Sequence, residues 1–317
     1  MRRTIALGAI LALLLAAFAG PSPTTAFDAP GLRPGDSWTY RTNTSLAAGF
    51  FLEGTATLAV MARETRIVEG VTLDVYRMSL NGLGTAAGTF TTDFGSTPAT
   101  GSWVLTGEEL FETRGLKVVT SVIDLEVNGT LHTEPAPLTF RLSVQNTTTL
   151  RLLENTWQFP FNVGDSGTMT ARSNFSEDFR LFYGFPTTPI HSEGVGWRNV
   201  TYEAEGEVSV DTPMGRFETV RVRHMREDGT YILSYFSPAA GNDAKSETYN
   251  ESAQLGSAEL VSYRYQALEA PRFLGLSSTD WATALAVVAA TTAVALFWIR
   301  HRRRRGFTPQ LEPPPTS

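Results

Sequence analysis

Residues 218–236 read ETVRVRHMREDGTYILSYF, two alternating runs on either side of the pair Asp228-Gly229. Both positions of such a pair tolerate a positive φ, so Asp-Gly is a strong signal for a two-residue hairpin turn. One face of the first run carries Val220, Val222 and His224, and the other carries Thr219, Arg221 and Arg223. An apolar face opposite a polar face is typical of an antiparallel sheet with one side in water.

The same alternation recurs along the chain between its two apolar ends. The run 119–127 places apolar residues on one face and ends at Asn128-Gly129, a second hairpin signal. The run 261–265 alternates Val and Tyr with Ser and Arg. Helical periodicity is nearly absent, and short runs rich in Val, Thr, Tyr and Phe are broken by Gly or Pro. We therefore expect this part of the chain to be mainly β, in antiparallel sheet.

A weak internal repeat runs through this region. The pair Gly-Asp occurs at Gly35-Asp36 and at Gly164-Asp165, and each time it opens a polar strand. The pair Glu-Gly occurs at Glu53-Gly54 and at Glu205-Gly206, and each time it precedes a longer run. The two kinds of pair are 18 residues apart in the first copy and 41 apart in the second, which leaves open whether a duplication underlies the pattern. If it does, the ectodomain consists of two similar β units, residues 27–154 and 155–272.

The C-terminal part contains a candidate membrane span. Residues 281–299, WATALAVVAATTAVALFWI, carry no charge, and Trp281 and Trp298 lie near the two ends, where indole rings prefer the membrane–water boundary. At ~1.5 Å per residue the helix is about 28 Å long, close to the ~30 Å hydrocarbon core. Five arginines follow, and the positive-inside rule places them in the cytoplasm. The sequence predicts a linker at 273–280, a transmembrane helix at 281–299 and a basic cytoplasmic tail at 300–317.

The N-terminus has the order of regions found in a secretory signal. Arg2 and Arg3 precede an apolar run, and a segment of small residues and proline follows. We expect residues 1–26 to form a signal peptide cleaved after Ala19 or Ala26, with an uncleaved signal anchor as the alternative. Together with the C-terminal span, this predicts a single-pass cell-membrane protein with its N-terminal domain outside the cell.

Composition narrows the function classes. The chain has no cysteine, so disulfides, thiolate nucleophiles and sulfur-ligated metals are excluded. The net charge is −6 at pH 7, and seven arginines belong to the two terminal segments, so the ectodomain is more acidic still. A strongly acidic domain is a poor partner for nucleic acid or an anionic lipid surface.

Six of the ten asparagines stand in the glycosylation pattern Asn-X-Ser/Thr, namely Asn43, Asn128, Asn146, Asn174, Asn199 and Asn250. This frequency fits a glycosylated cell-surface protein. The alternative is chance, because threonine-rich strands raise the number of such motifs.

Known catalytic and metal-binding patterns give little support for an enzyme. Gly164-Asp165-Ser166-Gly167 is similar to the nucleophile segment of trypsin-like serine proteases, but Ser166 needs a histidine base held by an aspartate. His132, His191 and His224 lie in no such setting and in no metal-ligand spacing. We expect no enzyme activity, no metal and no cofactor.

Arg221 and Arg223 are the candidate ligand-binding residues. They share the polar face of one strand, about 7 Å apart at ~3.4 Å per residue, a spacing at which two guanidinium groups could bind a carboxylate or phosphate. The alternative is a cross-strand ion pair with a glutamate or aspartate of this acidic chain.

Three short segments carry a resemblance: Gly35-Asp36-Ser37-Trp38, residues 212–218 (TPMGRFE) and residues 235–241 (YFSPAAG). Over about residues 160–266 the chain resembles exported bacterial and archaeal β domains of unknown function that look similar to the lipoprotein-carrier fold. The resemblance implies a curved antiparallel sheet in a half-barrel, here in a membrane-anchored version. It carries no catalytic residue. Gly167 stands where the second opening should have its tryptophan, which weakens the two-unit interpretation.

These observations favour a binding module for an apolar or amphiphilic ligand, or for an envelope partner, because a half-barrel rich in aromatic residues can enclose one. The alternative use of the aromatic residues is simply to fill the core. A structural envelope or surface-layer-associated glycoprotein is the second hypothesis. A hydrolase with Ser166 as nucleophile is the third.

Overall fold

The computed structural model describes residues 29–47, 49–92, 95–183, 185–186 and 189–265. The described part is almost entirely β and contains no helix. Its strands are β1 (Ser37–Ala47), β2 (Phe50–Val68), β3 (Val71–Thr92), β4 (Gly95–Glu112), β5 (Val118–Leu131), β6 (Leu138–Asn155), β7 (Ser166–Tyr183), β8 (Phe185–Pro186), β9 (Ile190–Thr212), β10 (Gly215–Arg226), β11 (Thr230–Ser237), β12 (Asn242–Asn250) and β13 (Ala253–Arg264). The expected mainly β, antiparallel fold is confirmed.

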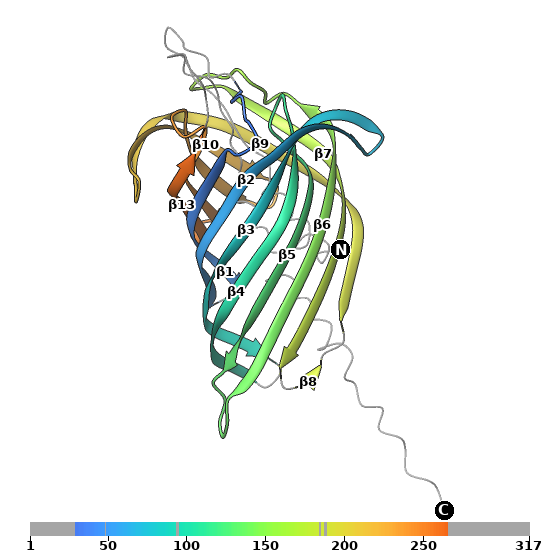
Figure 1. The fold of residues 1–317 in the computed structure, drawn as a ribbon, viewed down its shortest axis with the longest axis vertical. Coiled ribbons are helices and arrows are strands. Elements are labelled where there is room, and N and C mark those ends of the chain that lie inside the picture. Colours follow the sequence, from blue (N-terminus) through green and yellow to red (C-terminus); the bar gives the residue numbers. More distant parts are fainter. Residues whose placement is uncertain (1–28, 48, 93–94, 184, 187–188, 266–317) are drawn as a thin grey trace, which may run out of the picture.

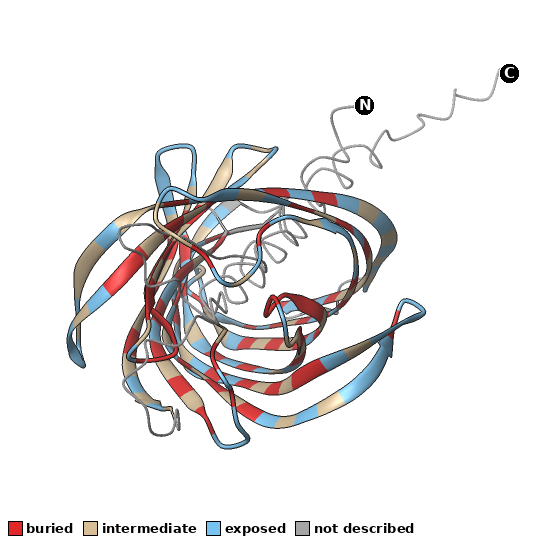
Figure 2. Ribbon diagram, turned by 90° about the horizontal axis from the view of Figure 1, so that it is seen from above, coloured by how far each residue is buried: buried red, intermediate tan, exposed pale blue. Residues whose placement is uncertain are grey.

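Twelve of these strands close into a ring (Figure 1). Strands β1 to β6 are paired in chain order, β7 joins β6 to β9, and β9 to β13 continue in order until β13 pairs with β1. Strand β8 pairs only with the end of β7. Figure 2 looks down on the ring and shows the strands curving around a common interior.

The expected half-barrel is therefore corrected to a closed sheet. Strands β6 and β7 pair from Phe140 opposite Tyr183 to Asn155 opposite Met169. An open sheet would leave the N–H and C=O groups along one side of each of these two long strands without partners, and closure satisfies them. The proposed boundary between residues 154 and 155 lies at the end of β6. Six long strands precede it and six follow it, and all belong to the one ring.

The first Gly-Asp pair forms the turn that leads into β1. Gly35, with φ of +94°, donates its N–H to Val60 O at 2.9 Å, and Val60 donates back to Asp36 O at 2.8 Å. The Asp36 carboxylate accepts the Arg33 N–H at 2.8 Å. A positive φ at the first position explains the glycine. The turn attaches the start of β1 to β2, the second strand of the first half.

The second Gly-Asp pair forms the same turn before β7. Gly164, with φ of +100°, donates to Ala204 O at 2.9 Å, and Ala204 donates to Asp165 O at 3.1 Å. The Asp165 carboxylate accepts the Asn162 N–H at 3.0 Å. Ala204 belongs to β9, the second long strand of the second half. The repeat seen in the sequence thus corresponds to one hydrogen-bonding pattern that occurs at equivalent places in the two halves.

A hairpin is present at Asp228-Gly229 as predicted, but three residues, 227–229, connect its strands instead of two. Strand β10 ends at Arg226 and β11 begins at Thr230, and Gly229 has φ of +83°. The reversal at 213–215 between β9 and β10 also has its glycine, Gly215, at a positive φ of +113°.

The hairpin predicted at Asn128-Gly129 is wrong, because both residues lie within β5. A Cβ added to Gly129 would lie 2.3 Å from Thr100 O and 2.6 Å from Cε1 of Phe140. The glycine is needed for the close approach of neighbouring strands and an aromatic ring, and not for a turn.

Two of the three segments that carry the resemblance meet inside the fold. Trp38 on β1 is fully buried and donates its indole N–H to Ala240 O at 2.7 Å. Tyr40 donates its hydroxyl to Asp243 O at 3.0 Å. A Cβ on Gly241 would lie 2.5 Å from the ring of Tyr265, so only glycine fits there. The Gly-Asp-x-Trp opening and the segment 235–241 are thus two sides of one contact.

Alternation along the strands separates the inner face of the ring from the outer face. The inner face holds one large apolar core, and its bulkiest buried side chains are Trp38, Tyr40, Phe50, Trp103, Phe111, Trp157, Phe161, Phe179, Tyr202 and Lys117. Trp157, Phe161 and Lys117 come from connections between strands and not from the strands themselves. Burial of this apolar area is the main stabilising contribution to a domain without disulfides.

Trp103 packs flat against glycines of two neighbouring strands. Cβ atoms added to Gly54, Gly82 and Gly84 would each lie 2.7 or 2.8 Å from its indole ring. The indole N–H donates to Glu53 O at 3.0 Å. The glycines therefore form the surface on which Trp103 lies, and a side chain on them would displace the ring.

The predicted signal peptide (1–26), linker (273–280), transmembrane helix (281–299) and basic tail (300–317) lie outside the described residues. The two predicted β units, 27–154 and 155–272, extend slightly beyond the described residues at their outer ends. None of the described segments forms a helix with the length and apolar character of a membrane span.

Replacing Gly84 with alanine is expected to destabilise the fold by about 1–3 kcal/mol, because the added Cβ overlaps Glu53 O and the Trp103 ring. The matched control is Gly196→Ala in β9, where an added Cβ meets nothing within 4 Å. That change is expected to stay within about 0.5 kcal/mol of wild type. Urea denaturation followed by tryptophan fluorescence measures both, and equal stabilities for the two variants would contradict this packing.

Candidate functional site

The structure brings the predicted pair Arg221 and Arg223 together on the outer face, with Glu205 between them. The Nε atoms of both arginines lie 2.5 Å from the two oxygens of that carboxylate. A β-bulge explains the arrangement: Arg221 lies opposite Gly206 and Val222 opposite Ala204, so Glu205 has no directly opposing residue. The cross-strand ion pair considered from the sequence is the one present, and the carboxylate bound here belongs to the chain.

The serine and histidines of the sequence analysis do not form a catalytic triad in the structure. Ser166 is exposed on the outer face, whereas His224 is buried on the inner face beside Tyr202. His132 is hydrogen-bonded to Thr100 at 2.9 Å, and His191 lies 3.3 Å from Asp178, both exposed. Across the described residues, no three His, Asp or Glu side chains gather in a way that would hold a metal ion.

The six glycosylation candidates differ in exposure. Asn43, Asn128, Asn199 and Asn250 are exposed, and Asn174 is half-buried with its side-chain amide donating to Glu69 at 2.8 Å. Asn146 is 5% exposed and faces the interior from β6. A glycan cannot be accommodated at that position in the folded ring, so Asn146 is withdrawn as a candidate.

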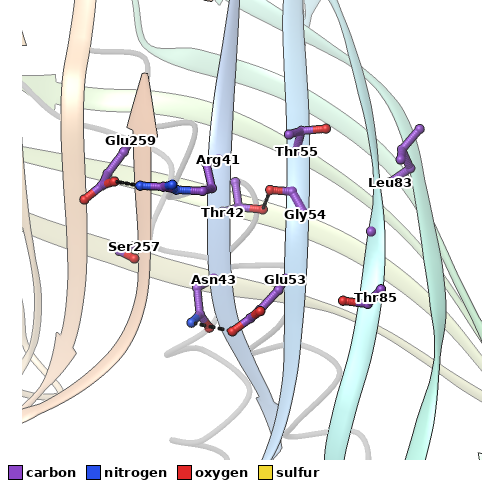
Figure 3. Close-up of a pocket in the computed structure, with 11 residues that line it drawn as sticks. Arg41, Thr42, Asn43, Glu53, Gly54, Thr55, Leu83, Thr85, Ser257 and Glu259 are labelled. Carbon is purple, nitrogen blue, oxygen red and sulfur yellow. Dashed lines mark hydrogen bonds and ion pairs between the residues drawn. The ribbon is translucent and has the colours of Figure 1, made fainter. Parts of the chain in front are cut away.

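A shallow groove of about 690 Å³ lies on the outer face across β13, β1, β2 and β3 (Figure 3). Its polar side chains bind one another: Arg41 lies 2.6 Å from Glu259, and Asn43 donates to Glu53 at 3.1 Å. Asn43 is also a glycosylation candidate, and a glycan there would cover the groove. The groove therefore has few groups left over for a ligand.

The inner face carries two polar clusters that the sequence analysis did not identify. The first, the inner acidic cluster, comprises Glu109, Ser121, Asn146, Thr148 and Glu177 on β4 to β7. Ser121 donates to Glu109 at 2.9 Å, and Thr148 donates to the side-chain oxygen Oδ1 of Asn146 at 2.9 Å. Burial raises the pKa of Glu109 to about 7 against the hydrogen bond from Ser121, which lowers it. Burial also raises the pKa of Glu177 to about 7, against a hydrogen bond from Asn146.

The second, the inner basic cluster, comprises Lys117, Arg198 and Arg226. Lys117 is fully buried, and its Nζ lies 4.6 Å from the centre of the Tyr202 ring, a cation–π contact. Burial, and then the charge of Arg226, hold the pKa of Arg198 well below its usual value. Burial lowers the pKa of Arg226 to about 10, although Asp228 and Tyr202 act in the opposite direction.

Aromatic and imidazole rings connect the members of the basic cluster. Trp157 stacks on Tyr202 with ring centres 5.6 Å apart, and His224 lies 5.4 Å from Tyr202 on the next strand. Burial, together with the charge of Lys117, holds the pKa of His224 well below its usual value. His224 is therefore neutral at pH 7. The positive charge of the cluster comes from Lys117 and the two arginines.

Strand parity is the signal that could have located these residues in the sequence. Arg198 alternates with Val200, Tyr202 and Ala204, all buried, whereas its neighbour Trp197 is 67% exposed. An arginine in phase with an apolar face is an informative exception to the alternation. Lys117 lies in the connection between β4 and β5, where no periodicity applies.

Comparisons with known proteins add little. No family model matches the chain, and no curated protein sequence matches it significantly. Among solved structures, it is similar to a protein of Bacteroides fragilis NCTC 9343 described as exported and as having a YmcC-like fold. The identity is 14%, the alignment covers 75% of this chain and 99% of that chain, and the TM-score is 0.30. A likeness of this degree says nothing about activity or ligand.

The acidic cluster predicts that stability falls as pH rises. The pKa of about 7 in the folded protein exceeds the ordinary glutamate value of 4.5, so between these pH values the folded state holds protons that the unfolded state releases. The stability present below about pH 4.5 is lost as pH rises through about 7. The loss is at most about 3 kcal/mol for each group.

Replacing Glu109 with glutamine removes that loss, so Glu109→Gln is expected to exceed wild type in stability at pH 8 and to match it near pH 4.5. Urea denaturation at the two pH values measures this. The control is Glu126→Gln: Glu126 is bound by Asn128 and Arg141, which lower its pKa, so this change is not expected to stabilise the protein at pH 8. A Glu109→Gln variant with the pH dependence of wild type would show that Glu109 is ionised throughout.

Proposed function

We propose that this chain is an exported, single-pass membrane protein whose ring of strands binds an amphiphilic molecule at its inner face. The apolar segment 281–299 would anchor it, with the ring outside the cell and the tail 300–317 in the cytoplasm. The signal-peptide pattern at residues 1–26 and the arginines after residue 299 support this orientation. The activity is binding, with no chemical step.

The observation that carries the proposal is the closure of twelve strands around an apolar, aromatic inner face. Closed sheets of eight strands are just wide enough to be filled by their own side chains or to hold one small ligand, and the diameter grows with strand number. Twelve strands therefore enclose more space than eight. The three buried tryptophans of the inner face, Trp38, Trp103 and Trp157, would supply contact area to an apolar chain.

The polar clusters support an amphiphilic ligand over a purely apolar one. Charged groups are expensive to bury without partners, so a core made only for stability has little reason to contain Arg198 and Arg226, each of which has side-chain nitrogens without an acceptor among the described residues. A ligand with a polar end offers those groups partners. The inner face thus has regions suited to both parts of an amphiphile.

A structural envelope glycoprotein is the second candidate, and one observation favours it. Asn43, Asn128, Asn199 and Asn250 are exposed, so four glycosylation motifs are sterically open to modification. On this reading the aromatic side chains fill the ring, and no ligand enters it.

Tryptophan quenching by a brominated fatty acid separates the two candidates. In the full-length protein in nonionic detergent, Trp281 and Trp298 of the predicted span and the outward Trp197 are first replaced by phenylalanine. The remaining emission comes from Trp38, Trp103 and Trp157, which are at most 2% exposed. Saturable quenching that unbrominated fatty acid reverses is the expected result, because bromine quenches only on contact.

The control retains Trp197, which is 67% exposed on the outer face. The fluorescence that Trp197 adds is expected to be quenched by aqueous iodide and to remain when the brominated fatty acid saturates the protein. Absence of saturable quenching from the three inner tryptophans would contradict ligand binding and favour the structural candidate.

A further inference from the structure

Arg198 and Arg226 face the interior of the ring from neighbouring strands. Arg198 on β9 precedes Val200 by two residues, and Val200 lies opposite Arg226 on β10. Residues two apart on a strand share a face, so the two side chains start from diagonal positions on the inner face. They are close enough for the charge of Arg226 to lower the pKa of Arg198.

Both guanidinium groups are buried but only partly hydrogen-bonded. Arg198 is 3% exposed and donates from Nη2 to Ser173 Oγ at 3.0 Å. The Arg226 side chain is 5% exposed and donates from Nη1 to Thr230 Oγ1 at 2.7 Å. Nη1 of Arg198, and Nε and Nη2 of Arg226, have no acceptor among the residues that the structure describes. Buried charged donors without acceptors are strongly unfavourable.

The charges around the two arginines do not balance within the described residues. Asp228 Oδ2 lies 3.7 Å from Arg226 Nη1, but Asp228 Oδ1 already accepts the N–H and hydroxyl of Thr230. Lys117 adds a further positive charge against the Tyr202 ring. The two arginines therefore face one carboxylate, that of Asp228, which leaves an excess of about one positive charge.

We propose that Arg198 and Arg226 bind the anionic head group of the ligand, a carboxylate or a phosphate, with Lys117 contributing charge. A planar guanidinium presents parallel N–H groups that match the oxygens of such an anion. The three N–H groups without acceptors would then be satisfied, and the excess charge would be neutralised. The apolar part of this ligand rests on the function proposed above, whereas the anion site rests on the two arginines themselves.

The test compares dodecanoate with its uncharged methyl ester, using competition against the brominated fatty acid in the full-length protein. Wild type is expected to bind dodecanoate at least about tenfold more tightly than the ester, the difference expected from hydrogen bonds to a charged group. Arg198→Met and Arg226→Met are each expected to lower the affinity for dodecanoate by about tenfold and to leave the affinity for the ester unchanged. The control is Arg172→Met, because Arg172 is exposed on the outer face of β7, next to Ser173.

A second arm uses inorganic phosphate and distinguishes a free anion from a head group. Phosphate is expected to raise the melting temperature of wild type more than sodium chloride of equal ionic strength does, and this excess is expected to vanish in Arg198→Met/Arg226→Met. Retained ester binding shows that the variants are folded. If a variant loses ester binding as well, the anion site is judged from wild type alone, by its preference for acid over ester and by its phosphate effect.

The outcomes separate this inference from the proposed function. Equal binding of acid and ester by wild type, with no phosphate effect, overturns the anion site and leaves the amphiphile-binding function standing. A phosphate effect that requires the two arginines, without binding of either amphiphile, supports the anion site and contradicts the amphiphile. Binding of neither amphiphile and no phosphate effect overturns both.

Discussion

The pairing of β6 with β7 is the contact on which the rest of the structure depends. It joins strands that lie in different halves of the chain, and it leaves each long strand with a partner on both sides. Without it, the backbone groups of two long strands would be exposed at open edges. Closure also creates an inside, and the apolar core, the acidic cluster and the basic cluster all lie on that inner face.

The sequence predicted what local chemistry determines. Alternation and the Asp228-Gly229 turn located β10 and β11 within a few residues, since both are set by neighbours along the chain. Asn128-Gly129 has the same local chemistry but lies within β5, where Phe140 and Gly101 of adjacent strands require the glycine. Closure was not predicted either, because nothing local to β6 or β7 indicates that they meet. The terminal segments, where the sequence predicts a signal peptide and a membrane span, lie outside the described residues.

The same division holds for the candidate site. Arg221 and Arg223 were found as a pair because their spacing on one strand is local, but their partner Glu205 comes from a bulge in another strand. Arg198 and Arg226 are far apart in sequence and share a site only through the register of β9 and β10. Lys117 reaches Tyr202 from a connection between strands. Strand parity could have marked Arg198 as inward-facing, but only the fold shows that Arg226 lies near it on the adjacent strand.

The matching turns at Gly35-Asp36 and Gly164-Asp165 have a consequence for how the ring assembles. Each turn ties the first strand of a six-stranded half to its second, so each half starts from its own local anchor. A half by itself would still expose two edges, β1 and β6 in one case and β7 and β13 in the other. Because both halves belong to one polypeptide, their edges meet at a high effective concentration, and closure is an intramolecular event that does not depend on protein concentration.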